Sequence, residues 1–148
     1  MKVCRPFLIV SSALALLIGL AAAPARAQGV AMAATVSSAE TAKAYRMDAA
    51  KHIYKVYADK IYKGKLPPLV HAIVVLEVEL DAGGNVRHVH MVRVPTHAPD
   101  VTARVRELIH HASPMPAPTR LGGARFTEIW LVDKSGRFQL DALTEGQL

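Results

Sequence analysis

The sequence has little of several residue types on which whole classes of protein depend. It holds one cysteine, Cys4, and only 5% of its 148 residues are aromatic. One cysteine cannot form a disulfide framework, and no thiol is left beyond position 4 to act as a nucleophile. No serine stands in a Gly-x-Ser-x-Gly turn, and Gly83 and Gly84 lie in a predicted hairpin rather than ahead of a helix. We therefore predict that the protein is not an enzyme and needs no cofactor.

Strong charge and long hydrophobic runs are scarce too. Charged residues make up 20% of the chain, and the net charge is +6. Without residues 1–27, 15 basic and 12 acidic side chains remain, which is a net charge of +3. This excess is too small for a dedicated nucleic-acid binder. A single long apolar run excludes a polytopic membrane protein, and the rest of the chain has the length of one small domain.

The one long apolar run lies near the N-terminus and has the layout of a secretory signal peptide. Residues 7–23 carry no charge, follow the basic residues Lys2 and Arg5, and precede an A-x-A site that ends at Ala27. We predict that residues 1–27 are a signal peptide, cleaved after Ala27. An uncleaved anchor is the alternative, although at about 1.5 Å per residue the run falls short of the roughly 30 Å hydrocarbon core.

Residues 28–66 are predicted to form a flexible lead followed by a basic amphipathic helix. Ser37 and Glu40 have the spacing of a capping box, so the helix is expected over residues 38–62. One stripe at 3.6-residue spacing holds Tyr45, Ala49, His52, Ile53, Val56 and Tyr57. We expect the lysines opposite this stripe to face solvent. The alternative is that they contact an acidic partner or an anionic membrane surface. The lysines available for that contact are Lys51, Lys55, Lys60 and Lys63.

Residues 72–80 and 86–94 are predicted to form a β-hairpin around the turn at residues 81–85. Alternation of apolar with acidic side chains gives the first strand one buried face. Strict alternation in the second strand would bury two histidines, whereas a bulge near residues 87–88 brings apolar side chains to the core face. We predict the bulge because burying histidine costs more free energy. The apolar side chains concerned are Val86, Val89 and Met91.

Residues 99–112 and 125–132 are predicted to be a second helix and a third strand. A proline opens the helix, and apolar residues follow Val101 at i+4, i+7, i+8 and i+11. The proline run 114–118 ends this helix. One face of the third strand holds Phe126, Glu128, Trp130 and Val132. Residues 137–143 have the pattern of a short final strand, and the order of elements indicates an α+β fold that begins with a helix.

The chain has seven histidines, which we expect to be surface side chains rather than metal ligands. They are His52, His71, His88, His90, His97, His110 and His111. His88 and His90 can point the same way from one strand, but zinc needs three or four converging ligands. No pattern brings a third ligand to them, so no metal site is predicted. A small metal-dependent or hydrolytic enzyme is the weaker alternative.

Residues 67–148 carry, in one order, the motifs of a known domain family. The motifs are Val74-x-Leu76-x-Val78, Leu80-Asp-Ala-Gly-Gly84 and Asn85-Val-x-x-Val89-x-Met91, then an amphipathic helix, the proline run 114–118 and a last strand with Phe126 and Trp130. In this order they resemble the C-terminal domain of TonB and, more distantly, that of TolA. The resemblance implies a β-β-α-β unit with the helix packed on one face of a small three-stranded antiparallel sheet.

The resemblance also implies a function in the periplasm. Members of the family pair an exposed edge strand with an extended peptide from the plug of an outer-membrane receptor, by β-augmentation. The matching edge strand here comprises Arg125, Phe126, Thr127, Glu128, Ile129, Trp130, Leu131 and Val132. Alternatively, this strand is covered by residues 137–143 or by the N-terminal helix.

Two departures from the family pattern separate two hypotheses. Energy-transducing members have a membrane anchor with a functional polar residue, followed by a long proline-rich spacer. Here residues 7–23 have only Ser11 and Ser12 as polar residues, and residues 28–66 have a helical pattern. We therefore favour a periplasmic module that binds an extended peptide of an envelope protein. The alternative is an energy transducer for outer-membrane transport, anchored in the inner membrane through residues 7–23.

Overall fold

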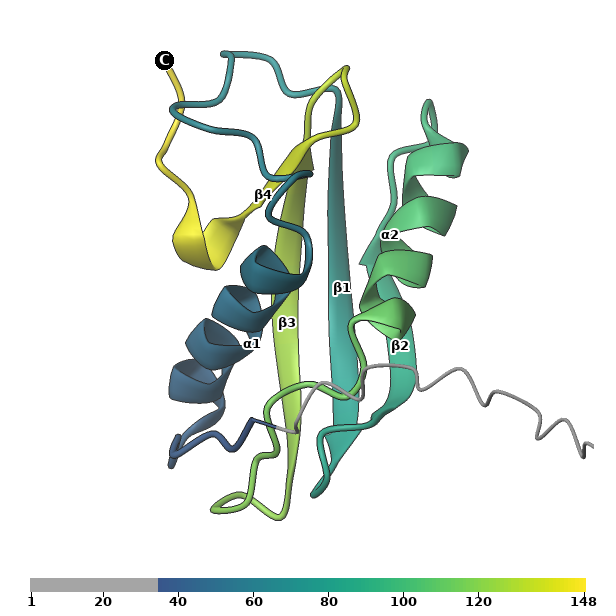
Figure 1. Cartoon of the computed structure of the whole chain (residues 1–148). Helices are drawn as coiled ribbons and strands as arrows, with labels where there is room; N and C mark the ends of the chain where they lie inside the picture. The colour runs from purple at the N-terminus through teal and green to yellow at the C-terminus, as the bar shows by residue number, and fades with distance from the viewer. Residues whose placement is uncertain (1–34) are drawn as a thin grey trace, which may run out of the picture. The chain divides into compact units, whose positions relative to one another are not determined.

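The structure, a computed structural model, describes residues 35–148, which form one sheet covered by two helices (Figure 1). The elements are α1 (Ala42–Val56), β1 (Ala72–Asp81), β2 (Val86–Arg93), α2 (Pro99–His111), β3 (Gly123–Val132), β4 (Phe138–Leu140) and a 3-10 turn, η1 (Asp141–Leu143). The predicted α+β class is confirmed. The sheet has four strands and not the three that the resemblance implies, because residues 138–140, within the expected short final strand 137–143, pair with β3.

The sheet is antiparallel throughout, in the order β2-β1-β3-β4. β1 and β3 form its centre and pair over ten residues, from Ala72 opposite Val132 to Asp81 opposite Gly123. Every second residue of β1 is buried, as the alternation in the sequence predicts. The sheet therefore has one apolar face, which other elements must pack against to shield it from water.

Both helices cover that apolar face. The ring of Tyr45 in α1 lies 5.8 Å from the ring of Phe126 in β3, and α1 also packs on η1. α2 lies over β1 and β2 through its predicted apolar stripe, in which Ile109 is fully buried. The Tyr57 hydroxyl, just after α1, donates to the Leu108 carbonyl of α2 at 2.7 Å. The basic helix thus belongs to the same core as the sheet.

The predicted bulge in β2 is confirmed. His88 lies opposite Glu79, but Val86 lies opposite Leu80, so Arg87 is an extra residue in the ladder. The bulge turns the predicted apolar residues Val86, Val89 and Met91 toward the core. Both strand histidines are exposed. A second irregularity, which the sequence did not predict, occurs between Val75 and Leu76.

The first helix is shorter than predicted at both ends. Its N-cap is Thr41, whose hydroxyl accepts a hydrogen bond from the Ala44 N–H at 3.2 Å. The predicted cap Ser37 instead donates its hydroxyl hydrogen bond to Asp48 at 2.6 Å. The helix ends at Val56 because the following segment pairs with β4 through the Tyr62 N–H and the Phe138 carbonyl, 2.9 Å apart. Helical geometry through Tyr62 is incompatible with this pairing.

The proline run packs closely on the turn between β1 and β2. The Met115 N–H donates to the Gly84 carbonyl at 2.8 Å. Gly84 has φ +85°, and a Cβ at this position would lie 2.1 Å from the Met115 carbonyl oxygen. Only glycine fits this contact.

Within residues 35–148, neither α1 nor α2 has the length and apolar character needed to cross a bilayer. The predicted signal peptide, residues 1–27, lies outside the described residues.

Candidate functional site

On one side, β3 pairs with a neighbouring strand along its whole length. On the other side, it pairs with a strand only at its C-terminal end. β1 pairs with all ten of its residues. β4 pairs only with Trp130, Leu131 and Val132. In the described part of the chain, residues 123–129 have no strand beside them on the β4 side. We call this stretch the free edge of β3.

The hydrogen bond of Ile129 shows which residues of the free edge point their backbone outward. The Ile129 N–H donates to the Glu128 carboxylate at 3.0 Å, and therefore does not serve the ladder with β1. Residues of an antiparallel strand direct their backbone groups to alternate sides. Arg125 and Thr127 therefore face outward like Ile129, and each presents one N–H and one carbonyl group along the free edge.

A buried carboxylate ends the free edge beside β4. Glu128 is fully buried and accepts two hydrogen bonds from the guanidinium of Arg46 in α1, at 2.7 and 3.2 Å. The same guanidinium donates to Asp141 in η1 at 2.9 Å, and the Ala142 N–H contacts Glu128 at 3.4 Å. The hydrogen bond to Glu128 is the main reason that the pKa of Arg46 is raised, and burial opposes it. This network fixes α1 and η1 to β3 and occupies the outward Ile129 N–H.

A cleft of about 370 Å³ lies between α1 and the free edge. It is lined by Ala42, Lys43, Arg46, Glu77, Arg125, Phe126 and Thr127. The Arg125 guanidinium lies 3.0 Å from the Glu79 carboxylate and 3.6 Å from that of Glu77. Lys43 is exposed and forms no ion pair within residues 35–148. Lys43 is therefore the cation of the cleft lining that no carboxylate of the described residues pairs with.

The predicted edge strand is free over only part of its length. Arg125 and Thr127 are exposed at the free edge, whereas Phe126 points into the core. The N–H of Ile129 is already bonded to Glu128. The edge prediction is wrong for residues 130–132, because β4 pairs with them; Trp130 and Val132 are also buried.

Sequence reasoning missed Lys43 and Arg46 as parts of this site. A signal for Arg46 was present, because Glu128 falls between Phe126 and Trp130 on the core face of β3. A buried carboxylate needs a cation or several hydrogen-bond donors. The sequence did not indicate which basic residue would supply them.

The outer edge of β2 is a poorer candidate for strand pairing. Its ladder with β1 is interrupted twice, and the irregularities leave Arg87 and Val92 without opposite residues. Arg87 and Arg93 are exposed. Bulges and charged side chains are the usual protection of an edge strand against pairing. The free edge of β3 shows no register shift in its ladder with β1.

The histidines form no metal site in the part of the chain that the structure describes. His88 and His90 lie opposite Glu79 and Glu77 on the uncovered face of the sheet. His52 is buried, contrary to the expectation of surface histidines, and its Nε2 lies 2.8 Å from the Ala112 carbonyl oxygen. His52 therefore helps to fix α1 to α2.

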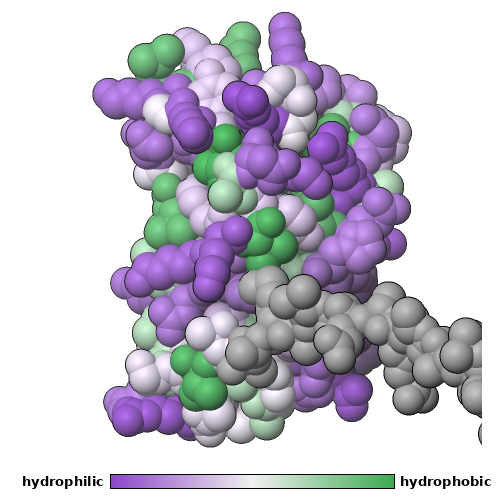
Figure 2. All heavy atoms as spheres, viewed as in Figure 1, coloured by the Kyte–Doolittle hydropathy of each residue, from purple (hydrophilic) through white to green (hydrophobic). Residues whose placement is uncertain are grey.

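The lysines proposed to contact a membrane lie in and after α1. Lys51, Lys55 and Lys63 are exposed, and the Lys60 ammonium lies 5.2 Å from the centre of the Tyr57 ring. Figure 2 shows hydrophilic side chains spread over one face of the molecule, with small hydrophobic areas between them. Contact of these lysines with an anionic surface stays a prediction.

Comparison with known proteins found no match. No protein-family model fits the sequence, and no curated protein and no solved structure is significantly similar to the chain. The resemblance to the TonB C-terminal domain therefore stays a prediction from the sequence pattern.

Proposed function

We propose that this domain is a periplasmic protein-binding module that adds an extended segment of an envelope protein to the free edge of β3. The observation that carries the proposal is the outward backbone of Arg125 and Thr127, without a neighbouring strand among the described residues. Main-chain hydrogen bonds to such an edge supply affinity, and side-chain contacts beside it supply selectivity.

The arrangement limits the length and chemistry of the segment that fits. A bound strand pairs with residues 123–127, since β4 and the Glu128 network occupy the rest of the edge. Arg125 and Thr127, with Gly123 in the same alternate position, offer the backbone hydrogen bonds for a segment of about five residues. Lys43 in the adjacent cleft favours an acidic side chain in that segment.

The test uses peptides from the plugs of outer-membrane receptors, added to the full chain labelled with 15N. We expect saturable changes in the amide resonances of residues 123–127, and slower hydrogen exchange at Arg125 and Thr127 in the complex. Failure of every plug peptide to bind, or changes confined to another surface, would overturn the proposal.

Thr127 provides matched variants. Thr127→Pro removes an outward N–H at an edge position, where proline is tolerated, and we expect it to abolish binding. Thr127→Val retains the N–H and the β-branched shape and should bind like the wild type. Ile129→Pro is a poorer test, because it removes an N–H that Glu128 already uses.

The periplasmic location requires export, and its support is the sequence of residues 1–27. The intact mass of the native protein from fractionated cells tests it. A soluble chain that begins at Gln28 is expected. A membrane-bound chain that retains residues 1–27 would replace the free module with the anchored energy transducer.

A further inference from the structure

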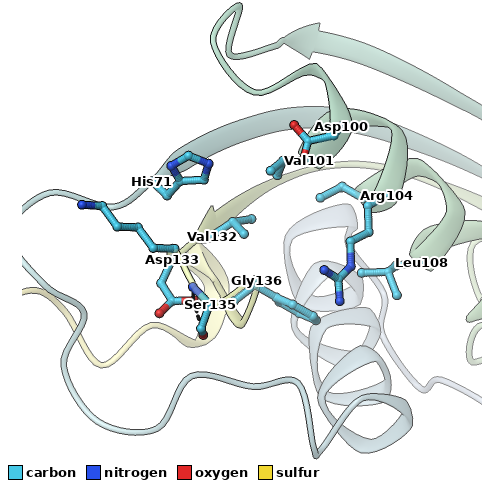
Figure 3. Close-up of a pocket in the computed structure, with 12 residues that line it drawn as sticks. His71, Asp100, Val101, Arg104, Leu108, Val132, Asp133, Ser135 and Gly136 are labelled. Carbon is cyan, nitrogen blue, oxygen red and sulfur yellow. Dashed lines mark hydrogen bonds between the residues drawn. The ribbon is translucent and has the colours of Figure 1, made fainter.

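A second hollow lies between α2 and the turn that joins β3 to β4 (Figure 3). We call it the α2 pocket. Its volume is about 180 Å³, and its residues come from α2, from the end of β3, from the following turn, from the start of β4 and from the segment before β1. It shares no residue with the cleft beside the free edge.

The inner wall of the α2 pocket is apolar. It is formed by Val101, Val105, Leu108, Val132 and Phe138, each at most 9% exposed. The Leu108 carbonyl already accepts a hydrogen bond from the Tyr57 hydroxyl, so a ligand does not have to supply a hydrogen-bond donor to it. A ligand that enters this pocket therefore meets hydrocarbon on its inner side.

The rim of the pocket carries cations without partners. Arg104 and Lys134 are exposed, and neither forms an ion pair with another residue of the range 35–148. The Arg104 guanidinium lies against the turn, since a Cβ on Gly136 would be 2.8 Å from its Nη1. In Figure 3 this guanidinium lies on the Gly136 side of the pocket. It is the planar group best suited to hold a carboxylate.

The two acidic residues of the rim balance its two cations in number, but neither forms an ion pair with Arg104. Asp133 is engaged in its own turn, where one carboxylate oxygen accepts hydrogen bonds from the Ser135 N–H, the Ser135 hydroxyl and the Arg137 N–H at 2.7–3.0 Å. The Asp100 carboxylate points away from the Arg104 guanidinium in Figure 3 and forms no ion pair with it. The lining as a whole carries no net formal charge, but within residues 35–148 no carboxylate occupies the Arg104 guanidinium, so its N–H groups are available to an anion.

The volume of the pocket sets the size of the ligand. A dry cavity of roughly 150 Å³ lined by Leu, Ile and Phe holds benzene. The α2 pocket accordingly has room for an alkyl group of about five or six carbons.

We propose that the α2 pocket binds a small aliphatic carboxylate, with its alkyl group on the wall formed by Val105, Leu108 and Phe138 and its carboxylate on Arg104. The proposal does not depend on peptide binding at β3, because the two sites have no lining residue in common. Either site can exist without the other.

The test titrates the full 15N-labelled chain with 4-methylpentanoate at neutral pH. We expect saturable changes in the amide resonances of α2 and the β3–β4 turn, with a Kd on the order of 1 mM for so small a ligand. The uncharged isostere 4-methylpentanamide should bind about tenfold more weakly, because it lacks the charge-assisted hydrogen bonds. Absence of saturable changes, or equal binding of acid and amide, would overturn the proposal.

Two arginines on the same helix give a matched pair of variants. Arg104→Gln should weaken 4-methylpentanoate binding by about tenfold, whereas Arg106→Gln, at an exposed position that does not line the pocket, should leave it unchanged. An equal loss in both variants would show a general charge effect instead of a site. Thermal unfolding of both variants at wild-type temperature would exclude a folding defect as the cause.

Discussion

Arg46 offers the most direct test of how the free edge of β3 is built. Its guanidinium neutralises Glu128, the one carboxylate that is fully buried within residues 35–148. Arg46→Met keeps an unbranched apolar stem but removes the donors. The substitution leaves Glu128 with only the N–H groups of Ile129 and Ala142.

The expected loss follows from the burial of the two partners. Removing one partner of a buried ion pair costs about 3–5 kcal/mol. The Arg46 side chain is 28% exposed and that of Glu128 is 0% exposed, so solvent reaches the cation but not the carboxylate. Two backbone donors also remain at Glu128. We therefore expect the free energy of unfolding to fall by about 3 kcal/mol, the lower end of that range.

Chemical denaturation of the full chain at neutral pH measures this loss. Glu128→Gln, introduced into the Arg46→Met variant, removes the uncompensated charge and should recover about half of the loss. A loss below about 1 kcal/mol for Arg46→Met would match a surface ion pair and refute the reasoning. Failure of Glu128→Gln to restore stability would refute it as well.

Three further predictions concern the turn between β1 and β2 and the free edge of β3. Gly84→Ala should lower the free energy of unfolding by at least about 2 kcal/mol in chemical denaturation, because the new Cβ meets the Met115 carbonyl at a positive φ. In hydrogen-exchange NMR of the free protein, the Thr127 amide should exchange much faster than the amides of β1, and equal protection would contradict the outward orientation. Hydrogen bonds from Asn85 lower the pKa of Asp81, so the stabilisation they give is present above the ordinary carboxyl range and is lost as the pH falls through the lowered value. Asn85→Ala should raise the pKa of Asp81 in an NMR titration, and an unchanged value would exclude this cause.

Local patterns in the sequence predicted the strands well. The alternation in β1 needs only the period of an extended chain, and the structure confirms it from Ala72 to Leu80. The bulge in β2 followed from comparing the cost of burying histidine with that of burying Val89 and Met91. These choices depend on neighbouring residues, so a single sequence is enough to make them.

The errors came from contacts between distant parts of the chain. The first helix ends early because the chain after it pairs with Phe138, and nothing near residue 57 signals that partner. Arg46 and Glu128 are 82 positions apart, so neither residue predicts the other. The free part of the edge depends on where β4 stops, which is set by the turn into η1. The site is therefore smaller than the strand that the sequence predicted.

The pairing between β4 and the segment after α1 sets an order for folding. The Gln139 side chain donates to the carbonyls of Tyr62 and Gly64, 77 and 75 positions earlier in the chain. Contacts of such long range are slow to form, because a large loop must close first. A growing chain therefore cannot complete the sheet until residues 138–140 have been synthesised, and until then the Trp130 side of the core stays uncovered by β4. The core around Trp130 is therefore completed only after β4 has been made.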